Sequence, residues 1–252
     1  MVLLVTSIEK QEQAASAGYV KYPEVKSLTK GMKYMDDFLR TTLNNADTPL
    51  LYTVALNGAS GTGEIRSARD ALLLTTDIVA GNDVGIITSG LTFKRTAILS
   101  ELDNRSQITL DVLFSVGTAT SNEAFVGLYN AASTVLTTLP TTQAHMGIYL
   151  DQSVSNNWQL TSADSSTQST TASSSAASAT VYCRLKIVWT GKNTATLTFS
   201  TWNSALTTET AQISQTVTAL GSVDEYVLQF FEQTETTAAR TLVVYYWKVD
   251  VD

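Results

Sequence analysis

The sequence has few of the residues on which thiol, imidazole and zinc chemistry depends. It contains one cysteine and one histidine in 252 residues. Cys183 therefore cannot form an internal disulfide, and a catalytic thiol or a zinc site needs several Cys or His partners. We expect Cys183 to be a small buried core residue and His145 to be a residue at a strand edge.

Charged residues are also scarce. They make up 15% of the chain, with a formal net charge of -7, whereas a typical domain has about 25%. There is no cluster of Lys and Arg of the kind that phosphate binding requires, so a nucleic-acid partner is excluded. About a quarter of the residues are Ser or Thr. A hydroxyl-rich surface is typical of extracellular or virion proteins; the alternative is that Thr simply suits exposed strand positions.

Long apolar runs are missing as well. No stretch approaches the roughly 18 apolar residues that a membrane-spanning helix requires. The opening MVLLVTSIEK has a short apolar run, no basic segment before it, and Glu9 directly after it. We therefore expect no cleaved leader, so a role outside the cell would require lysis or incorporation into a particle.

Short alternating segments dominate the chain from Pro49 onward. They are rich in Thr, Val and aromatic residues and are separated by Gly, Asn and Ser, which predicts one large antiparallel β-sandwich. The clearest are ITLDVLFSV at 108–116, AFVGLY at 124–129, MGIYL at 146–150, VYCRLKIVW at 181–189, TATLTFST at 194–201 and YVLQFFE at 226–232.

The closing segment, RTLVVYYWKVDV at 240–251, is a strongly apolar strand. Its alternate residues form a continuous apolar set, which we expect to face the core. A terminal strand of this kind is normally central, with a partner from early in the chain, as in jelly rolls. The set is Val243, Tyr245, Trp247, Val249 and Val251.

The tract at 162–180 has no large apolar side chain and cannot contribute to a core. It is either an exposed flexible loop or a pair of mostly solvent-facing strands around a small turn. We favour a partly extended edge with a mobile tip, because Thr favours strands and both flanking segments are predicted strands.

The N-terminal part differs in composition. At 27–44, apolar residues recur every three to four positions, which predicts an amphipathic helix; 8–17 is a second, shorter candidate. We expect residues 1–34 to be a partly helical arm and 35–252 the sandwich. The helix either caps the sandwich or attaches it to another protein. The attachment residues are Leu28, Met32, Met35 and Leu39.

The order of these motifs resembles concanavalin A-like or laminin-G-like jelly-roll domains of phage and viral structural proteins. The resemblance covers 35–252 and is carried by the order ALLLTT, ITLDVLFSV, AFVGLY, MGIYLD, NNW, RLKIVW, LTFSTWNS and TLVVYYWKVDV. It implies an all-β fold, an antiparallel jelly-roll β-sandwich with a short helical N-terminal extension. Lectins of that superfamily carry calcium and sugar on clustered Asp and Asn, and no matching set is present.

Carboxylates do not form a glycosidase motif. Hydrolases of this class usually place two Glu on one strand with one residue between them, and no ExDxxE or similar motif occurs on any predicted strand. Glu232 and Glu235 are three apart, which puts them on opposite faces of an extended strand. The sequence therefore predicts no enzyme.

Acidic and amide residues near turns give the one metal candidate. Asp77, Asn82, Asp83, Asp103 and Asn104 carry oxygen ligands that suit calcium. We favour the interpretation that they form turns, so we expect no metal site and no cofactor, with calcium as the alternative.

Two tryptophans are candidates for stacking on a sugar ring. Trp158 follows SNN and Trp202 lies in STWNS, both beside predicted turns. The alternative is packing in the core or between subunits.

These observations predict a non-enzymatic virion structural protein, such as a capsid decoration, turret or fibre component. We expect a homo-oligomer bound to the major capsid protein or a neighbouring structural protein. It would be made in the host cytoplasm and located in the virion. The alternative is a carbohydrate-binding module that recognises surface glycans.

Overall fold

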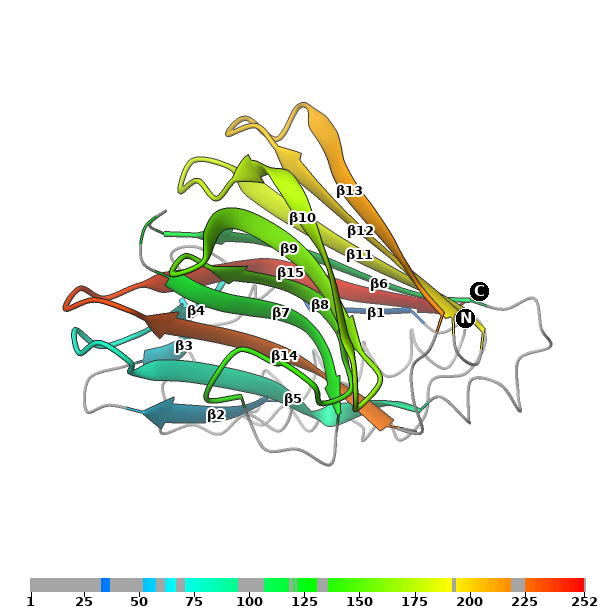
Figure 1. The fold of residues 1–252 in the computed structure, drawn as a ribbon, viewed down its shortest axis with the longest axis horizontal. Coiled ribbons are helices and arrows are strands. Elements are labelled where there is room, and N and C mark those ends of the chain that lie inside the picture. Colours follow the sequence, from blue (N-terminus) through cyan, green and yellow to red (C-terminus); the bar gives the residue numbers. More distant parts are fainter. Residues whose placement is uncertain are drawn as a thin grey trace, which may run out of the picture.

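The computed structural model of the chain describes residues 33–36, 52–57, 62–66, 71–94, 107–117, 120, 122–130, 136–191, 194–218 and 225–251. They form strands β1 to β15 joined by turns (Figure 1). None of the described residues is helical, so none belongs to a helix that could cross a membrane.

The strands form two antiparallel sheets that face each other (Figure 1). The 8-stranded sheet follows the order β13 (Glu209–Val217), β12 (Thr194–Trp202), β11 (Tyr182–Gly191), β6 (Ile108–Val116), β15 (Thr241–Val251), β4 (Ala71–Thr75) and β3 (Thr62–Arg66), with β1 (Lys33–Asp36) also paired to β15.

The 7-stranded sheet contains most of the central part of the chain. Strands β8 and β9 bend strongly along their length (Figure 1). The order is β10 (Gln168–Ala176), β9 (Ser155–Ala163), β8 (His145–Asp151), β7 (Asn122–Asn130), β14 (Glu225–Thr234), β5 (Asp83–Lys94) and β2 (Tyr52–Asn57).

The core lies between the sheets and consists of alternate side chains from both. Leu110, Val112 and Phe114 of β6 are fully buried, as is Leu160 of β9. Cys183 is also buried, as predicted, and burial raises the pKa of its thiol, so it remains protonated. The predicted antiparallel sandwich is therefore confirmed.

Strand β15 is central, as predicted. It pairs with β6 on one side and with β4 and β1 on the other, and all three precede it by more than a hundred residues. The predicted inward set, however, is wrong in its first half. The register shifts between Val244 and Tyr246, so Val244 and Trp247 both lie in the core. A bulge of this kind changes which face the following residues occupy.

Val243 and Tyr245, the first two residues of the predicted inward set, face outward instead. Val243 packs with Ala71 and Leu73 in a separate small cluster, against which Tyr245 lies half-buried. The Tyr245 hydroxyl is 3.0 Å from the Ser115 hydroxyl. The outer face of the 8-stranded sheet therefore carries part of the apolar set that the alternation assigned to the core.

The tract at 162–180 is an edge, as favoured above. Strand β9 continues to Ala163, and β10 returns along it as the last strand of its sheet. The turn between them is held by Asp164, whose Oδ1 accepts hydrogen bonds from the backbone N–H groups of Ser166 (2.9 Å) and Thr167 (3.0 Å).

The prediction of a helix at 27–44 is wrong for the four residues of that segment that the structure describes. Lys33–Asp36 form β1, in which Met35 pairs with Lys248 of β15. The unpaired backbone of a neighbouring strand can override local helix propensity. Leu28, Met32 and Leu39 lie outside the described residues, and the expected boundary between 34 and 35 falls inside β1. The attachment role stays a prediction.

Candidate functional site

The outer face of the 7-stranded sheet is partly covered by the connection between β7 and β8. Phe125, Tyr129 and Phe231 point to this face and form a buried cluster with Leu136 of the connection. The Leu136 N–H donates to Gln229 Oε1 at 3.1 Å, which ties the connection to β14. The covered part of the face is therefore apolar and closed.

Two glycines position the Phe125 ring. Gly127 and Gly147 pair across β7 and β8. A Cβ atom on Gly127 would lie 2.9 Å from Phe125 Cζ, and one on Gly147 would lie 3.0 Å from Phe125 Cε2. The ring therefore lies across two positions where only glycine leaves room.

His145 is structural. It is the first residue of β8 but is fully buried, with Nε2 2.8 Å from Thr161 Oγ1 and Nδ1 2.6 Å from the Gln143 carbonyl oxygen. Burial lowers the pKa of its imidazole to about 4. The ring is thus neutral at physiological pH and fastens β8 to β9 and to the preceding segment.

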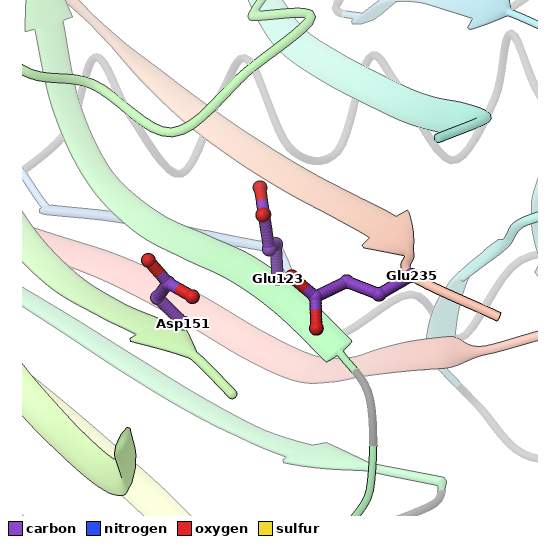
Figure 2. Close-up of side chains that lie close together, drawn as sticks. All are labelled: Glu123, Asp151 and Glu235. Atoms are coloured by element: carbon purple, nitrogen blue, oxygen red, sulfur yellow. The ribbon is translucent and has the colours of Figure 1, made fainter. Parts of the chain in front are cut away.

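Three carboxylates converge farther along the same face (Figure 2). Glu123 lies near the start of β7, Asp151 ends β8, and Glu235 follows β14 directly. One carboxylate oxygen of each lies within 4.8 Å of those of the other two. Glu123 pairs in register with Asp151 on one side and with Gln233 on the other, so the register of three neighbouring strands brings the carboxylates together.

Asp151 is the most firmly held of the three. Its Oδ1 accepts hydrogen bonds from the Ser153 N–H (3.1 Å), the Ser153 hydroxyl (2.6 Å) and the Val154 N–H (3.3 Å). These bonds fix the side chain in the turn between β8 and β9. One member of the cluster is therefore preorganised.

The cluster changes the protonation of Glu123. Burial, a hydrogen bond with Glu235 and the negative charges of Asp151 and Glu235 raise the pKa of Glu123 to about 7. Near neutral pH, Glu123 is therefore protonated in part of the molecules and ionised in the rest. Its oxygens can accept hydrogen bonds from ligand hydroxyl groups or coordinate a hard cation such as calcium.

A tyrosine lies next to this cluster. Tyr149 is two residues before Asp151 on the same face of β8, half-buried against the Phe125 cluster, and its hydroxyl donates to Gln159 Oε1 at 3.1 Å. Burial and the charge of Asp151 raise the pKa of its phenol, so it stays neutral. We call the surface formed by Glu123, Tyr149, Asp151, Gln159 and Glu235 the acidic patch.

The structure does not bring the two predicted tryptophans together. Trp158 is 1% exposed and packs edge-on against Phe114, with ring centroids 5.3 Å apart. No face of its ring is open to a sugar, so the stacking prediction is wrong for Trp158. Trp202 is half-buried and pairs with Tyr182 on the outer face of the other sheet, where its role stays a prediction.

The turn interpretation is confirmed for Asp77 and Asn82. Asp77 Oδ1 accepts from the Val79 N–H and Asp77 Oδ2 from Asn82 Nδ2, each at 2.8 Å. Both carboxylate oxygens are thus used within the turn. Asp103 and Asn104 lie outside the described residues.

Sequence reasoning did not find the acidic patch, although it placed Glu232 and Glu235 correctly on opposite faces. Glu232 is fully buried inside the sandwich and Glu235 lies in the patch. The available signal was the position of Glu123 directly before the predicted strand 124–129 and of Asp151 directly after the predicted strand 146–150, ends that meet if the two strands pair antiparallel. It required the register, which the sequence does not supply.

No protein-family model and no curated protein matches the sequence. Among solved structures, peanut lectin is 9% identical, with a TM-score of 0.57 over 88% of this chain and 99% of that chain. A glycoside hydrolase family 16 endo-glucanase from Bacteroides ovatus is 8% identical, with a TM-score of 0.52 over 86% and 99%. A protein of unknown function from Shewanella oneidensis MR-1 is 12% identical, with a TM-score of 0.53 over 88% and 87%.

At these identities the similarity concerns the fold alone. The neighbours include both lectins and glycoside hydrolases, built on the same pair of antiparallel sheets. The chain is a concanavalin A-like jelly-roll β-sandwich, as the order of its motifs implied.

Proposed function

We propose that this chain is a non-enzymatic carbohydrate-binding protein whose glycan site is the acidic patch. The observation that carries the proposal is the position of Tyr149, a half-buried aromatic side chain beside three convergent, half-buried carboxylates on the outer face of the 7-stranded sheet. Lectins among the solved structures of this fold support the same class of ligand.

The patch combines the two kinds of contact that sugars use. Carboxyl groups accept hydrogen bonds from hydroxyl groups, and these bonds are charge-assisted where the group is ionised, so three carboxyl groups within reach of one another can engage adjacent hydroxyls. The edge of the Tyr149 ring offers apolar surface for the C–H groups of a sugar, and its hydroxyl and Gln159 add polar contacts. A neutral polyhydroxy ligand satisfies all of these groups.

The carboxylates favour binding over hydrolysis. A glycosidase needs two carboxyl groups about 5–5.5 Å or 6.5–9.5 Å apart that flank the scissile bond. Here one oxygen of each of the three carboxyl groups lies within 4.8 Å of those of the other two, which is closer than either spacing. This close spacing is the reason we propose a binding protein and not a hydrolase.

The test is a glycan array followed by calorimetry with the strongest hit. The triple variant Glu123→Gln, Asp151→Asn, Glu235→Gln keeps the side-chain sizes and removes the charges. We expect it to weaken binding by at least about tenfold, because two or more charge-assisted hydrogen bonds are lost. Glu209→Gln, on the outer face of the other sheet, is the matched control and should bind normally.

Two further arms of the experiment define the chemistry. Binding that requires added calcium and is lost with a chelator means that the carboxylates act through a cation; binding in chelator means that they contact the sugar directly. Release of reducing ends from a bound polysaccharide would contradict the non-enzymatic part of the proposal. An array with no hit for the intact chain would contradict carbohydrate binding itself.

A further inference from the structure

The last strands of the two sheets meet along one side of the sandwich. Strand β10 ends the 7-stranded sheet and β13 ends the 8-stranded sheet. Two glutamines of β13 reach across to β10 and its neighbour β9. Gln212 Oε1 accepts from the Ser175 hydroxyl at 2.7 Å, and Gln215 Nε2 donates to Ser162 Oγ at 3.1 Å and to the Ser169 carbonyl at 3.3 Å.

A cavity of about 210 Å³ lies next to this contact. It lies where the turn between β9 and β10 approaches the end of β13. Most of its lining residues carry hydroxyl groups, and none is aromatic or basic. They are Ser162, Ala163, Asp164, Thr167, Ser169, Thr216, Val217 and Thr218.

A buried acceptor lies behind this wall. Gln215 is 7% exposed. Its Nε2 group donates both hydrogen bonds described above, to Ser162 and Ser169, and both of these residues line the cavity. Its Oε1 is buried and has no donor among the residues that the structure describes. A buried carbonyl oxygen without a donor costs free energy. Gln215 does not itself line the cavity, but its two hydrogen bonds fix Ser162 and Ser169, which do.

The lining excludes other classes of ligand. No Lys or Arg contributes, so an anion has no counter-charge. The one carboxylate, that of Asp164, accepts hydrogen bonds from Ser166 and Thr167 through Oδ1, so a cation would find a single carboxylate, with one of its oxygens already used. The hydroxyl groups make the wall too polar for an apolar ligand.

We propose that this cavity binds a small neutral polyhydroxy compound, a monosaccharide unit or a polyol, at a site separate from the acidic patch. Its hydroxyl groups exchange hydrogen bonds with the Ser and Thr side chains and with backbone groups of β10 and β13, each of which is the last of its sheet among the described strands. Without an aromatic ring for stacking, the affinity is on the order of 1 mM. The site does not depend on the proposed function of the patch.

The experiment is a titration of the isotope-labelled full chain with methyl α-glucoside, methyl β-galactoside and glycerol, followed by NMR. We expect saturable shifts of the amide signals of 162–169 and 215–218 with at least one of these probes. The double variant Thr216→Val, Thr218→Val should weaken this binding roughly tenfold, since two hydroxyl groups are lost. Thr170→Val, exposed on β10 outside the cavity, is the matched control.

A second variant keeps the test independent of hydrogen bonding. Ser169→Phe places a ring at the cavity and should abolish the shifts, whereas Ser174→Phe, exposed on the same strand, should leave them. Absence of shifts at 162–169 and 215–218 with all three probes overturns the proposal, and so do shifts that Ser169→Phe leaves unchanged. Repeating the titration with the triple variant of the acidic patch separates the two sites, because cavity shifts must survive there.

Discussion

Two glutamates show, at the scale of single residues, how the faces of the 7-stranded sheet differ. Glu123 points outward into a cluster of carboxylates, and Glu232 of the adjacent strand points inward and is fully buried. Burial raises the pKa of Glu232 well above its usual value, and the positive charge of Arg240 offsets this only in part. Both groups hold a proton more tightly in the folded protein than in the unfolded chain, for different reasons.

Glu232→Gln should stabilise the protein at high pH. Because the folded-state pKa of Glu232 is raised, its contribution to stability is fully present below about pH 4.5 and is lost as the pH rises through the folded pKa. The Gln side chain does not ionise, so the variant does not lose this stability as the pH rises. We expect the melting temperature of the variant at pH 8 to exceed that of the parent by a few degrees, since 1 kcal/mol corresponds to about 2–4 °C at this size.

Thermal melts at pH 4 and pH 8 check this prediction. The advantage of Glu232→Gln should shrink at pH 4, where both side chains are neutral. Equal pH dependence in the variant and the parent would show that Glu232 is not the group responsible.

Asp151→Asn should lower the pKa of Glu123 below its value of about 7, because a neighbouring negative charge is removed. The Glu123 pKa is raised from 4.5, so the folded state is favoured below pH 4.5 and loses that contribution as the pH rises through about 7. A carboxyl ¹³C titration followed by NMR measures the shift directly. Glu209→Gln is the control, and an unchanged Glu123 pKa in Asp151→Asn would contradict the described cluster.

At the scale of elements, β15 decides which side chains fill the core. The bulge between Val244 and Tyr246 puts Trp247 in the core and leaves Tyr245 half-buried outside. Trp247→Ala should therefore cost about 3–5 kcal/mol of unfolding free energy, the usual cost of removing a buried large aromatic. Tyr245→Ala should cost distinctly less, because part of its ring is already in water.

Urea denaturation of the two variants measures both costs. Under strict alternation the two side chains would lie on the same inward face. Equal losses for Tyr245→Ala and Trp247→Ala would therefore contradict the bulge.

The same strands show what can be predicted from sequence. The bounds expected at 108–116 match β6, because its large apolar residues recur at alternate positions between turn residues, interrupted by Thr109, Asp111 and Ser115. The hydroxyl-rich edge at β10 followed from the absence of large apolar side chains. The bulge, the pairing of 33–36 and the assembly of Glu123, Asp151 and Glu235 depend on contacts between distant strands, which local patterns do not encode.

At the scale of the whole molecule, the N-terminal part joins the sandwich through β1 beside β15. Assembly on a virion as a homo-oligomer stays a prediction. If it is right, deletion of residues 1–32, which leaves β1 intact, should abolish oligomers and keep the fold. Analytical ultracentrifugation and circular dichroism of the full and shortened chains test this, and a monomeric full chain at high concentration would contradict it.

The measurement that bears most directly on the proposed function is a crystal structure of the chain soaked with the glycan that binds best on the array. We predict a sugar against the Tyr149 ring, with its hydroxyl groups hydrogen-bonded to carboxylates of Glu123, Asp151 or Glu235 or to a cation that they hold. A sugar bound instead at Trp202, on the outer face of the other sheet, with the acidic patch free of ligand, would contradict the account.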